Sequence, residues 1–149
     1  MEPLARAMAE GATPDLAMLV GAIPYCRHLG VSAELRGGAP VLVMPFAEHL
    51  VGNVMLPALH GGVIGSLLET AAIVQMIWEM RSSRLPKPVD ITIDYLRSAR
   101  AATSYARARI AKQGRRVVNV HAEMWQEDET KPVAALRGHM LLPGAATAV

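Results

Sequence analysis

The chain has 149 residues, a formal net charge of +2 at pH 7 and a hydrophobic share of 52%. This length suffices for one domain with a sizeable core and is too short for two, and the composition is that of a soluble globular protein. The small net charge argues against general nucleic-acid binding.

The cysteine and histidine content gives no sign of a metal centre. Cys26 is the only cysteine, which excludes an intrachain disulfide framework, and the five histidines are scattered without metal-ligand spacing. We therefore expect no metal and no cofactor. A lone cysteine fits a reducing compartment, and the N-terminus lacks a basic start followed by an apolar segment, so we expect a cytoplasmic location.

Residues 1–22 predict an N-terminal helical extension. They are rich in Ala and Met and are interrupted by Gly11, Pro14 and Gly21, which favours one or two short helical pieces on the surface. We assign residues 23–149 to a single domain.

That domain opens with short elements. Residues 24–30 predict a short helix that begins near a proline and ends at a glycine, and residues 31–36 and 40–44 predict two strands of a hairpin. The segment 45–57 has little periodicity and predicts a connection, which carries Asn53 toward the next element.

Residues 56–80 predict a long helix that is apolar almost all round. It begins at a glycine pair, Gly61 and Gly62, and holds one acid, Glu69, in its middle. The residues that fit a period of 3.6 are Ile64, Leu67, Leu68, Ala71, Ala72, Val74, Ile77 and Trp78. The apolar run falls short of the ~20 residues that a membrane span needs and contains an acid, so we expect no membrane partner.

The rest of the chain predicts a meander of strands. Residues 89–96 alternate apolar and polar side chains with a period of two, residues 103–112 and 116–126 flank a tight turn, and residues 131–142 form a further strand. One long helix and an antiparallel sheet predict an α+β fold in which the sheet wraps around the helix.

The glycine pair at the helix start is a candidate oxyanion site. The first backbone N–H groups of a helix have no intrahelical acceptor and lie at the positive end of its dipole. Such a donor stabilises a carbonyl oxygen that becomes negative during acyl transfer. Alternatively, Gly61 and Gly62 only turn the chain into the helix.

Glu69 is the second candidate. A carboxylate on an apolar helix needs a partner, water or a raised pKa, because an unpaired buried charge is costly. A dry carboxylate is also suited to act as a general base or a nucleophile. Alternatively, Glu69 pairs with an arginine from the sheet or reaches water at the edge of the helix.

The spacing of these two candidates predicts an assembly. Gly61 and Glu69 are eight residues apart, which is about 12 Å along one helix, too far for both to act on one carbonyl carbon. If both are catalytic, they come from different subunits, with two antiparallel helices related by a twofold axis.

The run from His60-Gly61-Gly62-Val63 to Glu69-Thr70-Ala71, preceded by Asn53 and followed by the strand 89–96, resembles the hotdog-fold acyl-CoA thioesterases of the phenylacetic-acid-degradation type. The likeness covers roughly residues 23–142. Its most specific part is the His-Gly-Gly start with an acid nine residues after the histidine.

The resemblance implies a homodimer with shared active sites, often paired into a dimer of dimers, that hydrolyses acyl-CoA. The Gly61 N–H would polarise the thioester carbonyl, and Glu69 of the partner chain would activate water or attack directly. Asn53 would orient water or substrate, and His60 would be a structural or carbonyl-adjacent residue.

Two positions depart from the pattern. Asn53 lies seven residues before His60, where the family has six, and Pro88 stands where some members place a hydroxyl residue. Thr92 replaces that hydroxyl only if the strand register differs.

A basic cluster follows the cleanest strand. Its members Arg97, Arg100, Lys112, Arg115 and Arg116 are candidates to bind the phosphates of coenzyme A, with Gly62 and Thr92 as further substrate contacts. Alternatively, these cations are solvated edge and turn charges. Arg97 and Arg100 rank first.

Two further functions remain open. One is a non-catalytic acyl-CoA binding or sensing module, which needs the pocket but not Glu69. The other is a hydroxyacyl dehydratase, in which the acid and the histidine would be more widely separated and His60 would transfer a proton.

Overall fold

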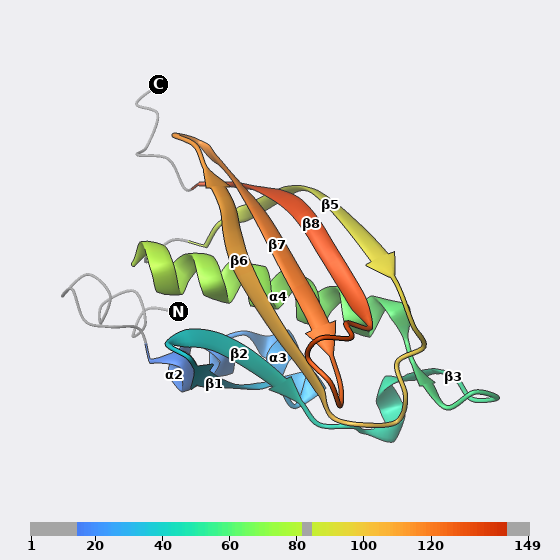
Figure 1. The fold of residues 1–149 in the computed structure, drawn as a ribbon. Helices are drawn as coiled ribbons and strands as arrows, with labels where there is room; N and C mark the ends of the chain where they lie inside the picture. The colour runs from blue at the N-terminus through green and yellow to red at the C-terminus, as the bar shows by residue number, and fades with distance from the viewer. Residues whose placement is uncertain (1–14, 82–84, 143–149) are drawn as a thin grey trace.

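The computed structural model describes residues 15–81 and 85–142, and in this part of the chain one long helix lies across a six-stranded antiparallel sheet (Figure 1). The helices are α2 (Leu16–Gly21), α3 (Pro24–Leu29), the 3-10 helix η1 (Glu48–Leu50) and α4 (Gly61–Met80). The strands are β1 (Ser32–Arg36), β2 (Ala39–Met44), β3 (Val51–Asn53), β4 (Ala58–Leu59), β5 (Lys87–Tyr95), β6 (Ser104–Gln113), β7 (Val117–Trp125) and β8 (Ala134–Leu141). The predicted α+β hotdog arrangement is confirmed.

The sheet order is β1-β2-β6-β7-β8-β5, so β5 is an edge strand next to β8. Its register sets which side chains face the helix. Thr92 lies opposite Arg137 and Asp94 opposite Ala135, on the face turned away from α4, and the alternation of a strand then turns Ile93 and Tyr95 toward the helix.

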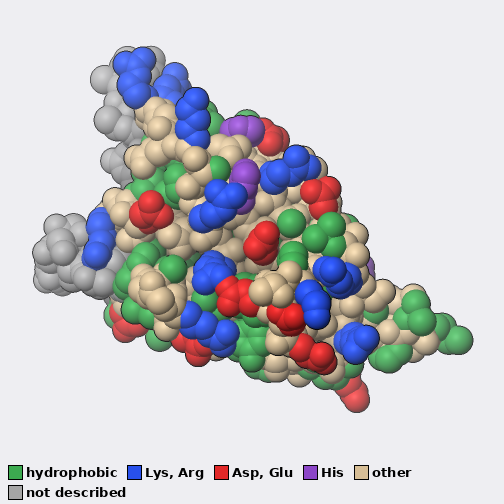
Figure 2. All heavy atoms as spheres, in the orientation of Figure 1, with side chains coloured by type: hydrophobic (Ala, Val, Ile, Leu, Met, Phe, Trp, Pro, Cys, Tyr) green, Lys and Arg blue, Asp and Glu red, His purple; other side chains and the backbone are tan. Residues whose placement is uncertain are grey.

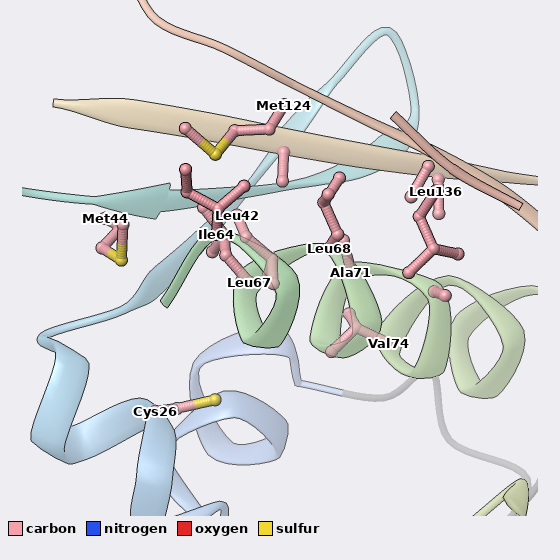
Figure 3. Close-up of a cluster of buried hydrophobic side chains, with 14 of the residues drawn as sticks. Cys26, Leu42, Met44, Ile64, Leu67, Leu68, Ala71, Val74, Met124 and Leu136 are labelled. Carbon is pink, nitrogen blue, oxygen red and sulfur yellow. The ribbon is translucent and has the colours of Figure 1, made fainter. Parts of the chain in front are cut away.

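The core lies between α4 and the inner face of the sheet (Figure 3). Leu67, Leu68 and Val74 of the helix have no exposed surface. The strands that face the helix present small buried residues, such as Ala106 and Ala122, between large ones, such as Met124 and Leu136, so the large aliphatic side chains of the helix pack closely on the sheet. The two surfaces therefore interlock by size, and the position of α4 over the sheet is fixed.

The helix α4 meets the length and composition of a membrane span, which corrects the expectation from the sequence that it is too short. It has 20 residues, and 61% of its most apolar window is buried inside the protein. The core helix of a soluble protein passes the same test, because a sheet can cover an apolar helix as a bilayer does.

The segment before α4 also differs from the expected irregular connection. It contains η1 and the two-stranded hairpin of β3 and β4, and the helix begins at Gly61 rather than at residue 56. Strands of three and two residues are too short to show periodicity. Figure 1 shows this hairpin, labelled β3, projecting from the body of the molecule.

The predicted N-terminal extension is described only from residue 15. Its helix α2 is not a surface piece: Leu16, Leu19 and Val20 are buried in the common core. The spacing of these residues places one apolar stripe of a short helix against the domain.

The outer face of the sheet is charged, as the mixture of basic, acidic and histidine side chains in Figure 2 shows. Arg137 pairs with Asp94 at 3.2 Å, and His139 Nδ1 lies 3.0 Å from Asp90. These contacts pair polar side chains on the face opposite the helix. His139 and Asp90 therefore contribute to contacts between strands of the sheet.

Candidate active site

The start of α4 leaves one backbone donor open. His60 caps the helix: its Nδ1 accepts the Gly62 N–H at 2.9 Å, and its carbonyl oxygen accepts from Val63 and Ile64 at 2.9 and 3.2 Å. Within residues 15–81 and 85–142, the Gly61 N–H has no acceptor. It is therefore the free donor at the positive end of the helix dipole.

The same contacts strengthen that donor. The His60 carbonyl belongs to the peptide group that carries the Gly61 N–H, and two hydrogen bonds to the oxygen polarise this peptide group. Because His60 Nδ1 accepts a hydrogen bond, the neutral ring carries its proton on Nε2. This assigns His60 a capping role.

The β3–β4 hairpin holds His60 in place. The His60 N–H donates to the Leu50 carbonyl at 2.9 Å, and the Leu59 N–H donates to the Ala99 carbonyl at 3.0 Å. A Cβ atom at Gly52 would lie 2.6 Å from His60 Cα, so the backbone of β3 lies directly against the cap. Gly52 is a site residue that the sequence analysis missed.

Tyr95 was also missed. Its hydroxyl donates to the Gly61 carbonyl at 2.9 Å. A Cβ atom at Gly61 would lie 3.3 Å from that hydroxyl oxygen, and one at Gly65 would lie 3.0 Å from Ile93 Cδ1. The end of β5 thus lies over the first turns of α4, and the glycines permit this close approach. The phase of the β5 alternation could have pointed to Tyr95, which shares a face with Ile93.

Glu69 lies on a stripe of α4 that its own sheet leaves partly open. Gly62 on this stripe is exposed, and Ser66, Glu69 and Ile73 are half-buried. The Ser66 hydroxyl donates to the Gly62 carbonyl at 2.7 Å, and the Thr70 hydroxyl donates to the Ser66 carbonyl at 2.7 Å. The hydroxyls are thus bonded within the helix.

The Glu69 carboxylate differs from these hydroxyls. It has no hydrogen bond and no ion pair to any residue in the described ranges, including every arginine of the sheet there. Among the described residues it is therefore an acid without a partner, on a partly open stripe of mostly small side chains.

Asn53 lies at the far end of β3 and is exposed. Its Oδ1 accepts the Met55 N–H at 3.0 Å and so closes the turn of the hairpin. In the projecting hairpin Asn53 pairs with Ala58, three residues before Gly61, and the amide nitrogen of its side chain remains as a donor.

The predicted phosphate contacts separate into two groups. Arg97 and Arg100 lie in the segment whose Ala99 carbonyl bonds the β4 strand, so they are close to the helix start. Arg115 and Arg116 lie in the turn between β6 and β7, at the other end of a ten-residue strand that spans about 33 Å. One chain therefore does not bring the two groups together.

The structure also places the other predicted coenzyme A contacts, Lys112 and Thr92, and orders the side chain of Arg97. Lys112 lies near the end of β6 with the distant pair, and Thr92 faces away from α4. Arg97 Nη1 donates to the Pro132 carbonyl at 2.5 Å, which orders its guanidinium beside the helix start. Arg97 and Arg100 remain the best placed cations.

The hollow beside these two arginines also contains Asp128 and Lys131. Hydrogen bonds from the side chain and the backbone of Thr130, and then from Lys131, lower the pKa of Asp128 to about 2. Asp128 is therefore anionic at neutral pH and pairs with Lys131 at 3.1 Å. Glu127 also lines this hollow, so three cations, Arg97, Arg100 and Lys131, face two acids and leave a small positive excess.

The model of the thioesterase superfamily matches residues 56–133, more than half of the chain, and the chain belongs to this superfamily. With the fold above, it is a hotdog-fold thioesterase, as the His-Gly-Gly run predicted.

Particular relatives agree with this assignment. The chain is 29% identical over 139 residues to the medium/long-chain acyl-CoA thioesterase YigI of Salmonella typhimurium, covering 83% of this chain and 89% of the relative. A solved structure from Chromobacterium violaceum is 40% identical, with a TM-score of 0.73 and coverage of 95% and 97%. The Escherichia coli PaaI protein of the phenylacetic acid degradation operon shares the fold, with 24% identity, a TM-score of 0.71 and coverage of 95% and 97%.

Proposed function

We propose that this thioesterase hydrolyses acyl-CoA at sites shared between two copies of the chain. The observation that carries the proposal is a pair of unsatisfied groups on one helix: the Gly61 N–H, which lacks an acceptor, and the Glu69 carboxylate, which lacks a partner, in the described part of the chain. They are about 12 Å apart along α4, so each needs a complement from a second helix.

The open stripe of α4 favours that second helix. Gly62 and Ser66 of this stripe are small, and helices that meet through small side chains approach closely, at the lower end of the usual interaxial distance of about 8–10 Å. An antiparallel copy related by a twofold axis then brings Glu69 of the partner to Gly61 twice per dimer. A further pairing into a dimer of dimers is part of the proposal.

The chemistry follows from the two groups. The thioester carbonyl oxygen accepts the Gly61 N–H, which stabilises the negative charge that develops on that oxygen. In one route, Glu69 of the partner removes a proton from water as the water oxygen attacks the carbonyl carbon, the C–S bond breaks, and the thiolate of coenzyme A takes the proton. In the other route, the carboxylate attacks the carbonyl carbon and the C–S bond breaks, which releases the thiolate of coenzyme A and leaves a mixed anhydride. Water then hydrolyses this anhydride, which frees Glu69 and the acid product, and the thiolate takes up a proton from this water.

The remaining residues have supporting roles in this proposal. The side-chain amide of Asn53 donates to substrate or water, and Arg97 and Arg100 bind phosphate groups of coenzyme A. The name of the YigI relative favours medium or long acyl chains as the first substrates to examine.

The test is thioester hydrolysis by wild type, Glu69→Gln and Glu69→Ala over acyl-CoA substrates of graded chain length and one aromatic acyl-CoA. We expect kcat to fall by about 10² to 10⁴, the usual range for a lost general base, with thermal stability kept or raised because an unpaired acid is removed. Hydrolysis by Glu69→Gln at the wild-type rate on every substrate would refute the role of Glu69. Tight acyl-CoA binding without turnover by wild type would favour the binding module instead.

A further inference from the structure

The end of the β3–β4 hairpin exposes three consecutive large apolar side chains. Val54 is 83% exposed, Met55 87% and Leu56 66%, more than any other large hydrophobic residue in the described part of the chain. Figure 2 shows hydrophobic atoms at the end of the projection that Figure 1 labels β3. A run of this kind on a soluble protein marks a contact surface.

The hairpin presents these side chains on an ordered frame. Val51 pairs with Leu59, Asn53 pairs with Ala58, and Asn53 Oδ1 accepts the Met55 N–H at 3.0 Å across the turn. The turn therefore fixes the apolar side chains away from the chain's own sheet.

The hairpin tip, defined as Val54, Met55 and Leu56, is connected to the helix start. His60 follows the tip and is tied to Leu50 at the base of the hairpin. On the other side of the helix start, Tyr95 and Leu96 are 56% and 52% exposed, and Tyr95 contacts Gly61. Exposed apolar surface thus flanks the open Gly61 N–H on both sides.

The length of the hairpin fits a second helix. From Ala58 to His60 the extended chain spans about 7 Å, and the turn of residues 54–57 adds to this length, whereas packed helices are about 8–10 Å apart. A copy whose α4 lies against Gly61 is therefore within reach of the tip.

We propose that the hairpin tip packs against a second copy of this chain. The contact buries the apolar side chains of the tip. This inference rests on the proposed shared site and adds the surface that holds the two copies in register. By twofold symmetry each tip contacts the other copy, so one substitution removes two contacts.

The first test measures the alkylation rate of Met55→Cys in the native protein without lipid. The matched control is Leu35→Cys on β1, since Leu35 is 51% exposed in the single chain. The native Cys26 is buried, and burial raises the pKa of its thiol while a hydrogen bond with Thr70 lowers it, so it contributes little background. We expect Met55→Cys to react at least about 10-fold more slowly than Leu35→Cys, although residue 55 is the more exposed position in one chain.

The second test compares Met55→Asp with Leu35→Asp by sedimentation over a range of protein concentration. We expect Met55→Asp to raise the dissociation constant of the dimer by about 10²-fold, because a charge enters two buried contacts, and Leu35→Asp to leave it unchanged.

Either of two results would contradict the proposed contact between the hairpin tip and a second copy. The first is that Met55→Cys reacts as fast as Leu35→Cys or faster, which is the result for a tip that faces solvent or a lipid surface. The second is that the Met55→Asp dimer dissociates no more than the Leu35→Asp dimer, which is the result for a tip covered by its own chain. Neither readout involves turnover, so these outcomes are distinct from failure of the Glu69 prediction.

Discussion

The amide of Gly61 is an open donor because of what its neighbours do. His60 takes the Gly62 N–H with its ring and the next two N–H groups with its carbonyl, so one donor of the first turn is left. Glycine at position 61 also lets Tyr95 lie against the helix, since any Cβ there would lie 3.3 Å from the tyrosine oxygen. Gly61 thus provides a free N–H and also the space in which Tyr95 contacts the helix.

Tyr95→Phe tests the hydrogen bond separately from the ring. It removes the donor to the Gly61 carbonyl and keeps the ring over Gly61 and Gly65. We expect a loss of about 0.5–1.5 kcal/mol, which lowers the thermal midpoint by about 1–6 °C. Because the hydroxyl contacts the helix and not the substrate, kcat falls by no more than about 10-fold.

Tyr25→Phe is the matched control for that measurement. Tyr25 is 48% exposed and stacks on His28, and its hydroxyl has no hydrogen-bond partner among the described residues. An unchanged midpoint in Tyr95→Phe, equal to that of Tyr25→Phe, would contradict the stabilising role of the bond.

The β3–β4 hairpin positions the helix start through the backbone of Gly52. A Cβ at this position meets the Cα and Cβ of His60 at 2.6 and 2.7 Å, so Gly52→Ala displaces the cap and with it the Gly61 N–H. A small displacement of a catalytic donor is costly, and we expect kcat to fall by about 10-fold or more with a smaller change in KM.

Gly114→Ala is the control for Gly52→Ala. Its Cβ would lie 2.8 Å from the Val117 carbonyl oxygen, a similar clash, but at the turn between β6 and β7. We expect it to lower stability and to leave kcat unchanged at temperatures where the protein is folded. If both variants lose activity in proportion to stability, the positioning role of Gly52 is wrong.

At the scale of elements, periodicity predicted the long helix, the strand 89–96 and the meander, because each is long enough for its buried face to leave a pattern. The hairpin of β3 and β4 has three and two paired residues, so no pattern marks it. Gly52 and Tyr95 were missed for a related reason: their roles depend on contacts with His60 and Gly61 that arise only after folding.

At the scale of the whole molecule, spacing within one helix predicts that Gly61 and Glu69 do not act together within one chain. The described part of the chain holds the open Gly61 N–H and the unpaired Glu69 on α4, with no acid beside the donor and no donor beside the acid. The sequence could predict this because helical rise is fixed. It could not predict the exposed hairpin tip, since exposure depends on how the hairpin leaves the body.

A mixed dimer tests the shared site most directly. One chain carries Glu69→Gln and the other carries Gly61→Val, with different tags so that the heterodimer is purified. The Glu69→Gln homodimer lacks the acid at both sites. The Gly61→Val homodimer keeps the N–H, but its side chain crowds Tyr95 and obstructs the donor at both sites. Both homodimers are expected to be inactive. The heterodimer retains one site with Gly61 of the first chain and Glu69 of the second, and we predict about half of the wild-type activity per dimer. A heterodimer as inactive as both parents would contradict the account, because that is the result when donor and acid act within one chain.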